Sequence, residues 1–85
     1  MLHFDYTIRN KEGLHAMPAS KLAAYARSCQ DSIVIKSGDQ SAEASYLLGI
    51  LALGLHQGAE VTVEVTGLTE GTTLRELQAF FEENL

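Results

Sequence analysis

Histidine is the residue type in this chain with the clearest capacity for chemistry at neutral pH, and one of the three histidines has an unusual setting. His15 is preceded by Gly13 and followed by Pro18. Glycine permits a tight turn, and proline is tolerated in the first turn of a helix. The order therefore predicts a turn, then a histidine, then a helix whose free N–H groups and positive dipole end would face an anion.

Phosphoryl chemistry fits this setting. An unprotonated imidazole nitrogen is a nucleophile, and histidine carries one near neutral pH. Attack by His15 on phosphorus would place anionic oxygens beside the backbone N–H groups of Ala16 and Met17, and helix N-termini bind phosphate in this way. A histidine that only caps the helix, or lies at a surface turn, is the alternative that spacing alone leaves open. His3, on the polar face of a strand, and His56, in a loop, are weaker candidates.

Other classes of site find little support in the sequence. No two histidines have metal-ligand spacing, so we expect no metal, and the glycines form no nucleotide-binding pattern, so we expect no cofactor. Cys29 has no base beside it and is expected to be a structural thiol, whose unpaired state fits a cytoplasmic location. A net charge of −5 argues against nucleic acid as a partner. The longest apolar run, residues 46–55, is too short for membrane insertion.

Hydrophobic periodicity predicts a β-α-β-β-α-β-α order in a single domain, residues 1–85. Strands are expected at residues 2–8, 33–35, 41–45 and 60–66, and helices from 18 to about 28–31, from 46 to about 54, and after 71 to 85. Each strand–helix–strand unit makes a right-handed crossover that leaves room for another strand. We therefore expect an α+β fold, an open-faced β-sandwich, with a four-stranded antiparallel sheet in the order 1-4-2-3 covered on one face by three helices.

The second predicted helix is apolar on every side. Leu47, Leu48 and Leu51 form one stripe, and Ile50 and Leu53 form another. One stripe is expected to join the core, and the other to form an exposed patch of the kind that marks protein–protein sites. The alternative is that both stripes are covered.

The segment from Gly13 to Ala19, read as Gly-Leu-His-Ala-x-Pro-Ala, resembles the active-site signature of HPr, the histidine-containing phosphocarrier of the bacterial sugar phosphotransferase system. Residues 48–54 and 57–61 resemble the second helix and fourth strand of that family, so the resemblance covers the whole chain. It implies the open-faced sandwich described above. It also implies that His15 accepts a phosphoryl group from enzyme I and passes it to IIA-type proteins, as a carrier and not as a turnover catalyst on small substrates.

Two positions depart from the family pattern. The family has an arginine where this chain has Met17, so we expect weakened phosphoryl transfer unless Arg27 or Lys21 supplies the missing cation. Many relatives carry a regulatory serine where an ungapped alignment puts Tyr46, with Ser45 one residue earlier. Either Ser45 substitutes for that serine, or this regulation is absent, which we favour.

Both departures lie on the surface that the family uses for partners, which gives two hypotheses. The chain is a phosphocarrier with a variant set of partners, or it is an HPr-like regulatory paralogue that binds proteins with little phosphoryl transfer, including a transcriptional regulator. We expect a monomer or a weak dimer. The residues expected at the docking surface are Met17, Ser20, Leu47, Leu48 and Leu51.

Overall fold

Alternating apolar side chains give this chain a sheet with one buried face. The computed structural model describes residues 1–85. Its elements, in chain order, are β1 (Leu2–Thr7), α1 (Ala16–Ser28), β2 (Ser32–Ser37), β3 (Gln40–Glu43), α2 (Leu47–Ala52), β4 (Glu60–Thr66) and α3 (Glu70–Asn84). The strands form one antiparallel sheet in the order β1-β4-β2-β3. The predicted element order and sheet topology are confirmed.

One row of paired residues shows how the register builds the core. Phe4 of β1 pairs with Val63 of β4, which pairs with Ile35 of β2, which pairs with Ala42 of β3. Phe4, Val63 and Ile35 are buried, and Ala42 packs partly against them. Because side chains alternate across a strand, a shift of one residue in the pairing of any of these strands would turn that strand's apolar side chains to solvent. The apolar pattern therefore fixes the register.

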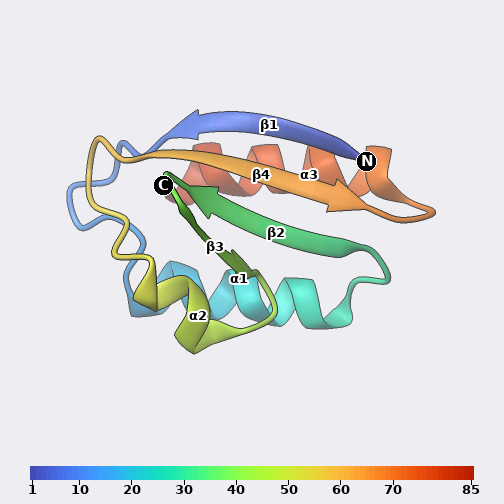
Figure 1. The fold of residues 1–85 in the computed structure, drawn as a ribbon, viewed down its shortest axis with the longest axis horizontal. Helices are drawn as coiled ribbons and strands as arrows, with labels where there is room; N and C mark the ends of the chain where they lie inside the picture. The colour runs from blue at the N-terminus through green and yellow to red at the C-terminus, as the bar shows by residue number, and fades with distance from the viewer.

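The three helices lie on the buried side of the sheet and leave the other side open, which is the open-faced sandwich expected from the sequence (Figure 1). On α3, the ring of Phe81 packs edge-on against Phe4 and Tyr6, with ring centroids 5.5 Å and 5.4 Å apart. On α1, Ala19, Leu22 and Ala23 are fully buried. Edge-to-face aromatic pairs add to the hydrophobic stabilisation from burial alone.

The helices begin and end at somewhat different residues from those predicted. Helix α1 begins at Ala16, so Pro18 is its third residue, still in the first turn where a missing N–H costs no hydrogen bond. Helix α2 is shorter than expected, because a turn bond from the N–H of Tyr46 to the carbonyl of Glu43 precedes it and Gly54, at φ 62°, follows it. The same turn explains why β3 ends before residues 44 and 45.

Asp31 ties the segment between α1 and β2 to the start of α3. Its buried carboxylate accepts hydrogen bonds from the N–H and the hydroxyl of Thr69, at 3.1 Å and 2.7 Å, and from the hydroxyl of Thr73, at 2.7 Å. The hydroxyl bonds from Thr73 and Thr69 hold the pKa of Asp31 below its usual value, although burial opposes them. Asp31 therefore anchors the start of α3 from a distant part of the chain, at the end where a negative charge is favourable.

A second bond joins the two long helices. The hydroxyl of Tyr25 on α1 donates to a carboxylate oxygen of Glu76 on α3 at 2.6 Å. Burial, and then the hydrogen bond to Glu76, raise the pKa of Tyr25 to about 12. Because the folded chain holds this phenol neutral, the contact couples folding to pH in the alkaline range.

We expect the Tyr25–Glu76 bond to stabilise the fold below about pH 10, where tyrosine is neutral even in the unfolded chain, and to be lost as the pH rises toward 12. Urea unfolding at a series of pH values should show a steeper alkaline loss of stability for the wild type than for Tyr25→Phe. At pH 7 the variant should lose about 1 kcal/mol. Parallel pH curves for the two proteins would contradict this assignment.

Candidate functional site

His15 occupies the cap position at the start of α1. Its backbone is extended, with φ −99° and ψ −173°, and its side chain makes no capping hydrogen bond. The imidazole is 38% exposed. His15 therefore stands where a helix cap would stand, but its side chain does not serve as one, and the ring is accessible to a reacting group.

The backbone donors around His15 have no partners. The first hydrogen bond of the helix runs from the N–H of Ala19 to the carbonyl of His15, at 3.0 Å. The N–H groups of His15, Ala16 and Met17 donate to no other group, and Pro18 has no N–H. Three donors and the positive end of the dipole of α1 are thus available to an anion at this corner.

Gly13 and Leu14 hold the corner in place. The N–H of Leu14 donates to the carbonyl of Leu55 at 2.9 Å, and the Leu14 side chain is buried. Gly13 has a φ of 67°, and a Cβ at this position would collide with the carbonyl oxygen of Leu55. Residue 13 must therefore be glycine for two reasons, one conformational and one steric.

We expect Gly13→Ala to lower the free energy of unfolding by about 2–4 kcal/mol, because it combines a left-handed alanine with displacement of the Leu55 carbonyl. Gly38→Ala is the matched control. Gly38 has a φ of 60°, but a Cβ there meets nothing within 4 Å. The control should lose only about 1–2 kcal/mol in urea unfolding. Equal losses of unfolding free energy in the two variants would show that the collision of the added Cβ with the Leu55 carbonyl has no energetic cost.

Most cationic side chains of the chain are committed elsewhere. The Arg27 guanidinium, at the far end of α1, donates to the carbonyl of Ser45 at 3.3 Å. The helix rise puts residue 27 about 18 Å from residue 15 along the axis. Lys11 and Lys21 are exposed, and neither makes a hydrogen bond or an ion pair. The structure thus directs Arg27 away from His15, whereas both uncommitted lysines flank the histidine in the sequence.

Glu12 approaches the imidazole, and the sequence analysis did not single it out. Its Oε1 lies 3.7 Å from Nε2 of His15. The turn that carries Glu12 is held by Asn10, whose side-chain oxygen accepts from the N–H of Glu12 at 3.0 Å. The available signal was the spacing, because an acid three residues before a histidine across a tight turn can reach its ring.

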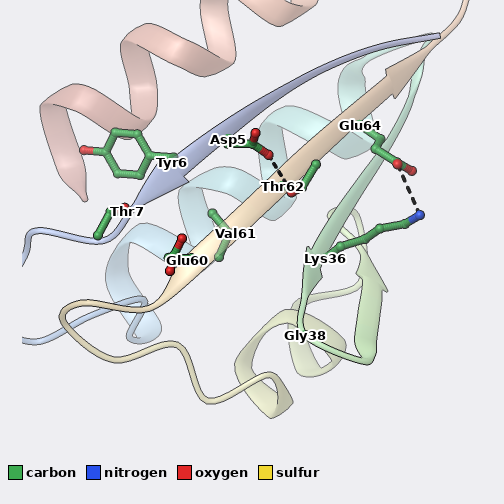
Figure 2. A pocket seen from close by; sticks show the side chains of 9 residues that line it. All are labelled: Asp5, Tyr6, Thr7, Lys36, Gly38, Glu60, Val61, Thr62 and Glu64. Atoms are coloured by element: carbon green, nitrogen blue, oxygen red, sulfur yellow. Dashed lines mark hydrogen bonds and ion pairs between the residues drawn. The ribbon is translucent and has the colours of Figure 1, made fainter.

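The largest hollow of the molecule lies elsewhere, on the open face of the sheet, with a volume of about 690 Å³ (Figure 2). Its charged side chains largely satisfy one another: Lys36 lies 3.1 Å from Glu64, and the hydroxyl of Thr62 donates to Asp5 at 2.7 Å. No residue of the His15 corner lines it. The free donors at His15, rather than this hollow, mark the candidate site.

Comparison with known families adds an independent observation. The family model described as the PTS HPr component phosphorylation site matches residues 2–83. The chain belongs to the HPr family. This membership supports a phosphocarrier role in general terms. The description of the family names a phosphorylation site, and the matched residues include His15.

Individual relatives agree with this assignment. A multiphosphoryl transfer protein of Xanthomonas campestris is 38% identical over 79 residues, which cover 93% of this chain but only 9% of that protein. A phosphocarrier protein HPr of Xylella fastidiosa is 29% identical and covers 96% of this chain and 92% of its own length. The crystal structure of an HPr from Thermoanaerobacter tengcongensis superimposes with a TM-score of 0.90 at 29% identity, over 96% of this chain and 92% of that one.

The surface next to the site in this HPr family member is partly apolar. Helix α2 packs against α1 (Figure 1). Met17, Tyr46 and Leu48 are 63%, 59% and 66% exposed. Leu47 and Leu51, predicted to share an exposed stripe with Leu48, are instead half-buried and pack against the core. The exposed apolar stripe is therefore narrower than expected, because α2 packs with Leu47 and Leu51 against the core.

The remaining predicted site residues have the following surroundings. Ser20 is exposed on α1, one turn beyond Ala16. Ser45 is half-buried in the loop before α2, where its carbonyl accepts from Arg27. Tyr46 is the N-cap residue of α2, and its ring lies against Gly49. No helix of the chain is long and apolar enough to cross a membrane.

Proposed function

We propose that this HPr family member is a phosphocarrier in which His15 accepts a phosphoryl group from enzyme I and transfers it to IIA-type proteins in the cytoplasm. In the first step a bond forms between an imidazole nitrogen and phosphorus, and the donor's bond to phosphorus breaks. In the second step the nitrogen–phosphorus bond breaks and the acceptor's bond forms. His15 is returned unchanged, so the protein carries the group and consumes no small substrate.

The observation that supports this proposal most directly is the set of unpaired N–H donors beside an accessible imidazole. The N–H groups of Ala16 and Met17 have no protein partner, and a phosphoryl group on His15 would bring anionic oxygens to them. Such charge-assisted bonds are stronger than neutral ones. The corner is suited to holding a phosphoryl group that has already been transferred.

Lys21 is the side chain that we propose as the substitute for the family's arginine. It lies one helical turn after Met17, on the same side of α1. Helical side chains lean toward the N-terminus, which favours the reach of its ammonium toward the phosphoryl position. Arg27, the other cation considered from the sequence, is held by Ser45 and has no place in this proposal.

Replacing Lys21 with glutamine should slow phosphorylation of His15 by about two- to fivefold, the effect of one solvent-exposed charge. Lys36→Gln removes the same charge on the open face of the sheet and should leave the rate unchanged. Rates are followed by the appearance of the phosphorylated mass. A Lys21→Gln rate equal to that of the control would leave the backbone donors as the whole phosphate site.

The test of the proposed function is a phosphorylation assay with phosphoenolpyruvate and enzyme I from the same cell. The wild type should gain the mass of one phosphoryl group, and a cognate IIA protein should remove it. His15→Ala should gain nothing, and His3→Ala, which loses an exposed histidine on β1, should behave as the wild type. A gain that survives His15→Ala, or no gain by the wild type, would overturn the proposal.

A regulatory protein-binding role is the second candidate, and the exposed side chains of Met17, Tyr46 and Leu48 favour it. Exposed apolar groups beside a site mark contacts with partner proteins. In that role this surface, with Ser20 and the exposed edges of Leu47 and Leu51, would bind a transcriptional regulator. Leu48→Glu should then weaken this binding without destabilising the fold, and unchanged binding would contradict this use of the surface.

Serine regulation is not part of the proposed function. An ungapped alignment puts Tyr46 at the position of the family's serine, and Ser45 beside it is half-buried. Treatment with a cognate HPr kinase should therefore give no acid-stable phosphate. Acid-stable phosphate that disappears in Ser45→Ala would restore a regulatory site at this position.

A further inference from the structure

The carboxylate of Glu12 faces one particular nitrogen of the His15 ring. Oε1 of Glu12 lies 3.7 Å from Nε2, the ring nitrogen farther from the backbone. The turn that presents Glu12 is doubly fixed by Asn10, whose side-chain oxygen accepts from the N–H of Glu12 and whose carbonyl accepts from the N–H of Gly13, at 3.0 Å and 2.9 Å. The fixed backbone of the turn thus places Glu12 beside the imidazole, with its carboxylate near Nε2.

A neutral imidazole has one N–H and one lone pair, and its surroundings decide which nitrogen carries which. The 3.7 Å between Oε1 and Nε2 is longer than a hydrogen bond, but the negative charge of an ionised carboxylate there favours a proton on the facing nitrogen. The lone pair then remains on Nδ1. We propose that Glu12 is a positioning residue for phosphoryl transfer, holding the proton on Nε2 of His15 so that Nδ1 is left as the nucleophile.

This inference rests on the proposed function, and the chemistry balances without movement of a proton. The lone pair of Nδ1 forms the bond to phosphorus, and the electron pair of the donor's bond to phosphorus leaves with the donor. Nε2 keeps its proton, so the ring becomes a phosphorylated imidazolium whose positive charge faces the Glu12 carboxylate. In the onward step the Nδ1–phosphorus bond breaks and its electron pair returns to Nδ1.

Glu12 also faces away from the incoming anion. Its contact is with Nε2, whereas the phosphoryl group would be bonded at Nδ1, across the ring. The Glu12 side chain is 76% exposed, so solvent screens its repulsion of the phosphoryl oxygens. Exposure also limits the benefit, and an exposed ion pair changes an equilibrium by about two- to fivefold.

The experiment compares Glu12→Gln with the wild type by nitrogen NMR of the labelled imidazoles, at a pH of about 8.5 where histidine is ordinarily neutral. The ratio of the Nε2–H to the Nδ1–H form of His15 should fall by about two- to fivefold in the variant. The rate of phosphorylation by enzyme I should also fall, by no more than this factor, because the rate follows the fraction of His15 that has its lone pair on Nδ1. Glu43→Gln, which removes an unpaired, exposed carboxylate on β3, should change neither quantity.

Each outcome decides between the possibilities. A tautomer ratio at His15 that is equal in the wild type and Glu12→Gln, or equally altered in Glu43→Gln, would overturn the inference. A shifted ratio with an unchanged phosphorylation rate would also overturn it, because Glu12 would then not serve transfer. Failure of the wild type to take up a phosphoryl group would instead overturn the proposed function, and with it this role. Measuring the wild type first separates the two failures.

Discussion

The Met17→Arg variant should be phosphorylated on His15 by enzyme I about ten times faster than the wild type. A guanidinium at this position would add charge-assisted hydrogen bonds to the phosphoryl oxygens, and such bonds contribute about 1.5–3 kcal/mol before solvent screening. We expect the lower part of that range because residue 17 is 63% exposed. Since 1.4 kcal/mol corresponds to a factor of ten in rate, the gain is about tenfold. The measurement is the initial rate of phosphorylation by enzyme I at limiting donor.

Two control variants separate charge from shape at this position. Met17→Gln adds hydrogen-bonding groups without charge and should accelerate transfer little, whereas Met17→Lys adds a point charge without the planar fork and should fall between glutamine and arginine. All three should unfold at the wild-type temperature, because Met17 contributes little to the core. A rate for Met17→Arg that matches the wild type would show that Lys21 already supplies the charge, or that another step limits the rate.

Asp31→Ala should give the largest loss of thermal stability of any single polar replacement in this chain. It would leave the buried hydroxyl of Thr73 and the partly buried N–H and hydroxyl of Thr69 without their acceptor. Unsatisfied buried polar groups are costly, and we expect the midpoint of thermal unfolding to fall by about 5–10 °C. Asp39→Asn, at an exposed position of the β2–β3 turn, is the control and should change it little.

The stabilisation by Asp31 should depend on pH with a definite sign. Its pKa is depressed in the folded chain by the Thr73 and Thr69 bonds. The contribution is therefore present above about pH 4, where the carboxyl is ionised even in the unfolded chain, and is lost as the pH falls through the folded pKa. The difference in stability between the wild type and Asp31→Asn should shrink on acidification. A difference that stays constant down to pH 2 would contradict this linkage.

Hydrophobic periodicity predicted most of this architecture, because the burial of apolar side chains is the main favourable term in folding. The alternation of residues 2–8 and 60–66 places their apolar side chains on one face, and the crossover rule then determines the order of the strands. The ends of elements were less accurate. The turn bond from Tyr46 to Glu43 and the left-handed Gly54 shorten α2, and neither follows from hydrophobicity.

Side-chain contacts between segments that are far apart in the chain could not be predicted from the sequence. The sequence predicts only that a helix ends near residues 28–31, yet Asp31 bonds to Thr69 and Thr73, which lie 38 and 42 residues later. Periodicity carries no information about such a pairing. The same holds for the burial of Leu47 and Leu51, which depends on how closely α2 approaches the sheet. The position of His15 was predictable because Gly13 and Pro18 beside it define the local geometry.

The bond from the N–H of Leu14 to the carbonyl of Leu55 has a consequence for folding kinetics. It joins the His15 corner to a loop 41 residues later, and β1, which leads into that corner, pairs only with β4. Closing such long loops is slow relative to forming a helix. The His15 corner is thus completed only when segments about 40 or more residues apart in the chain have met. Uptake of a phosphoryl group during refolding should therefore appear in step with the last structural phase, and not with the formation of α1.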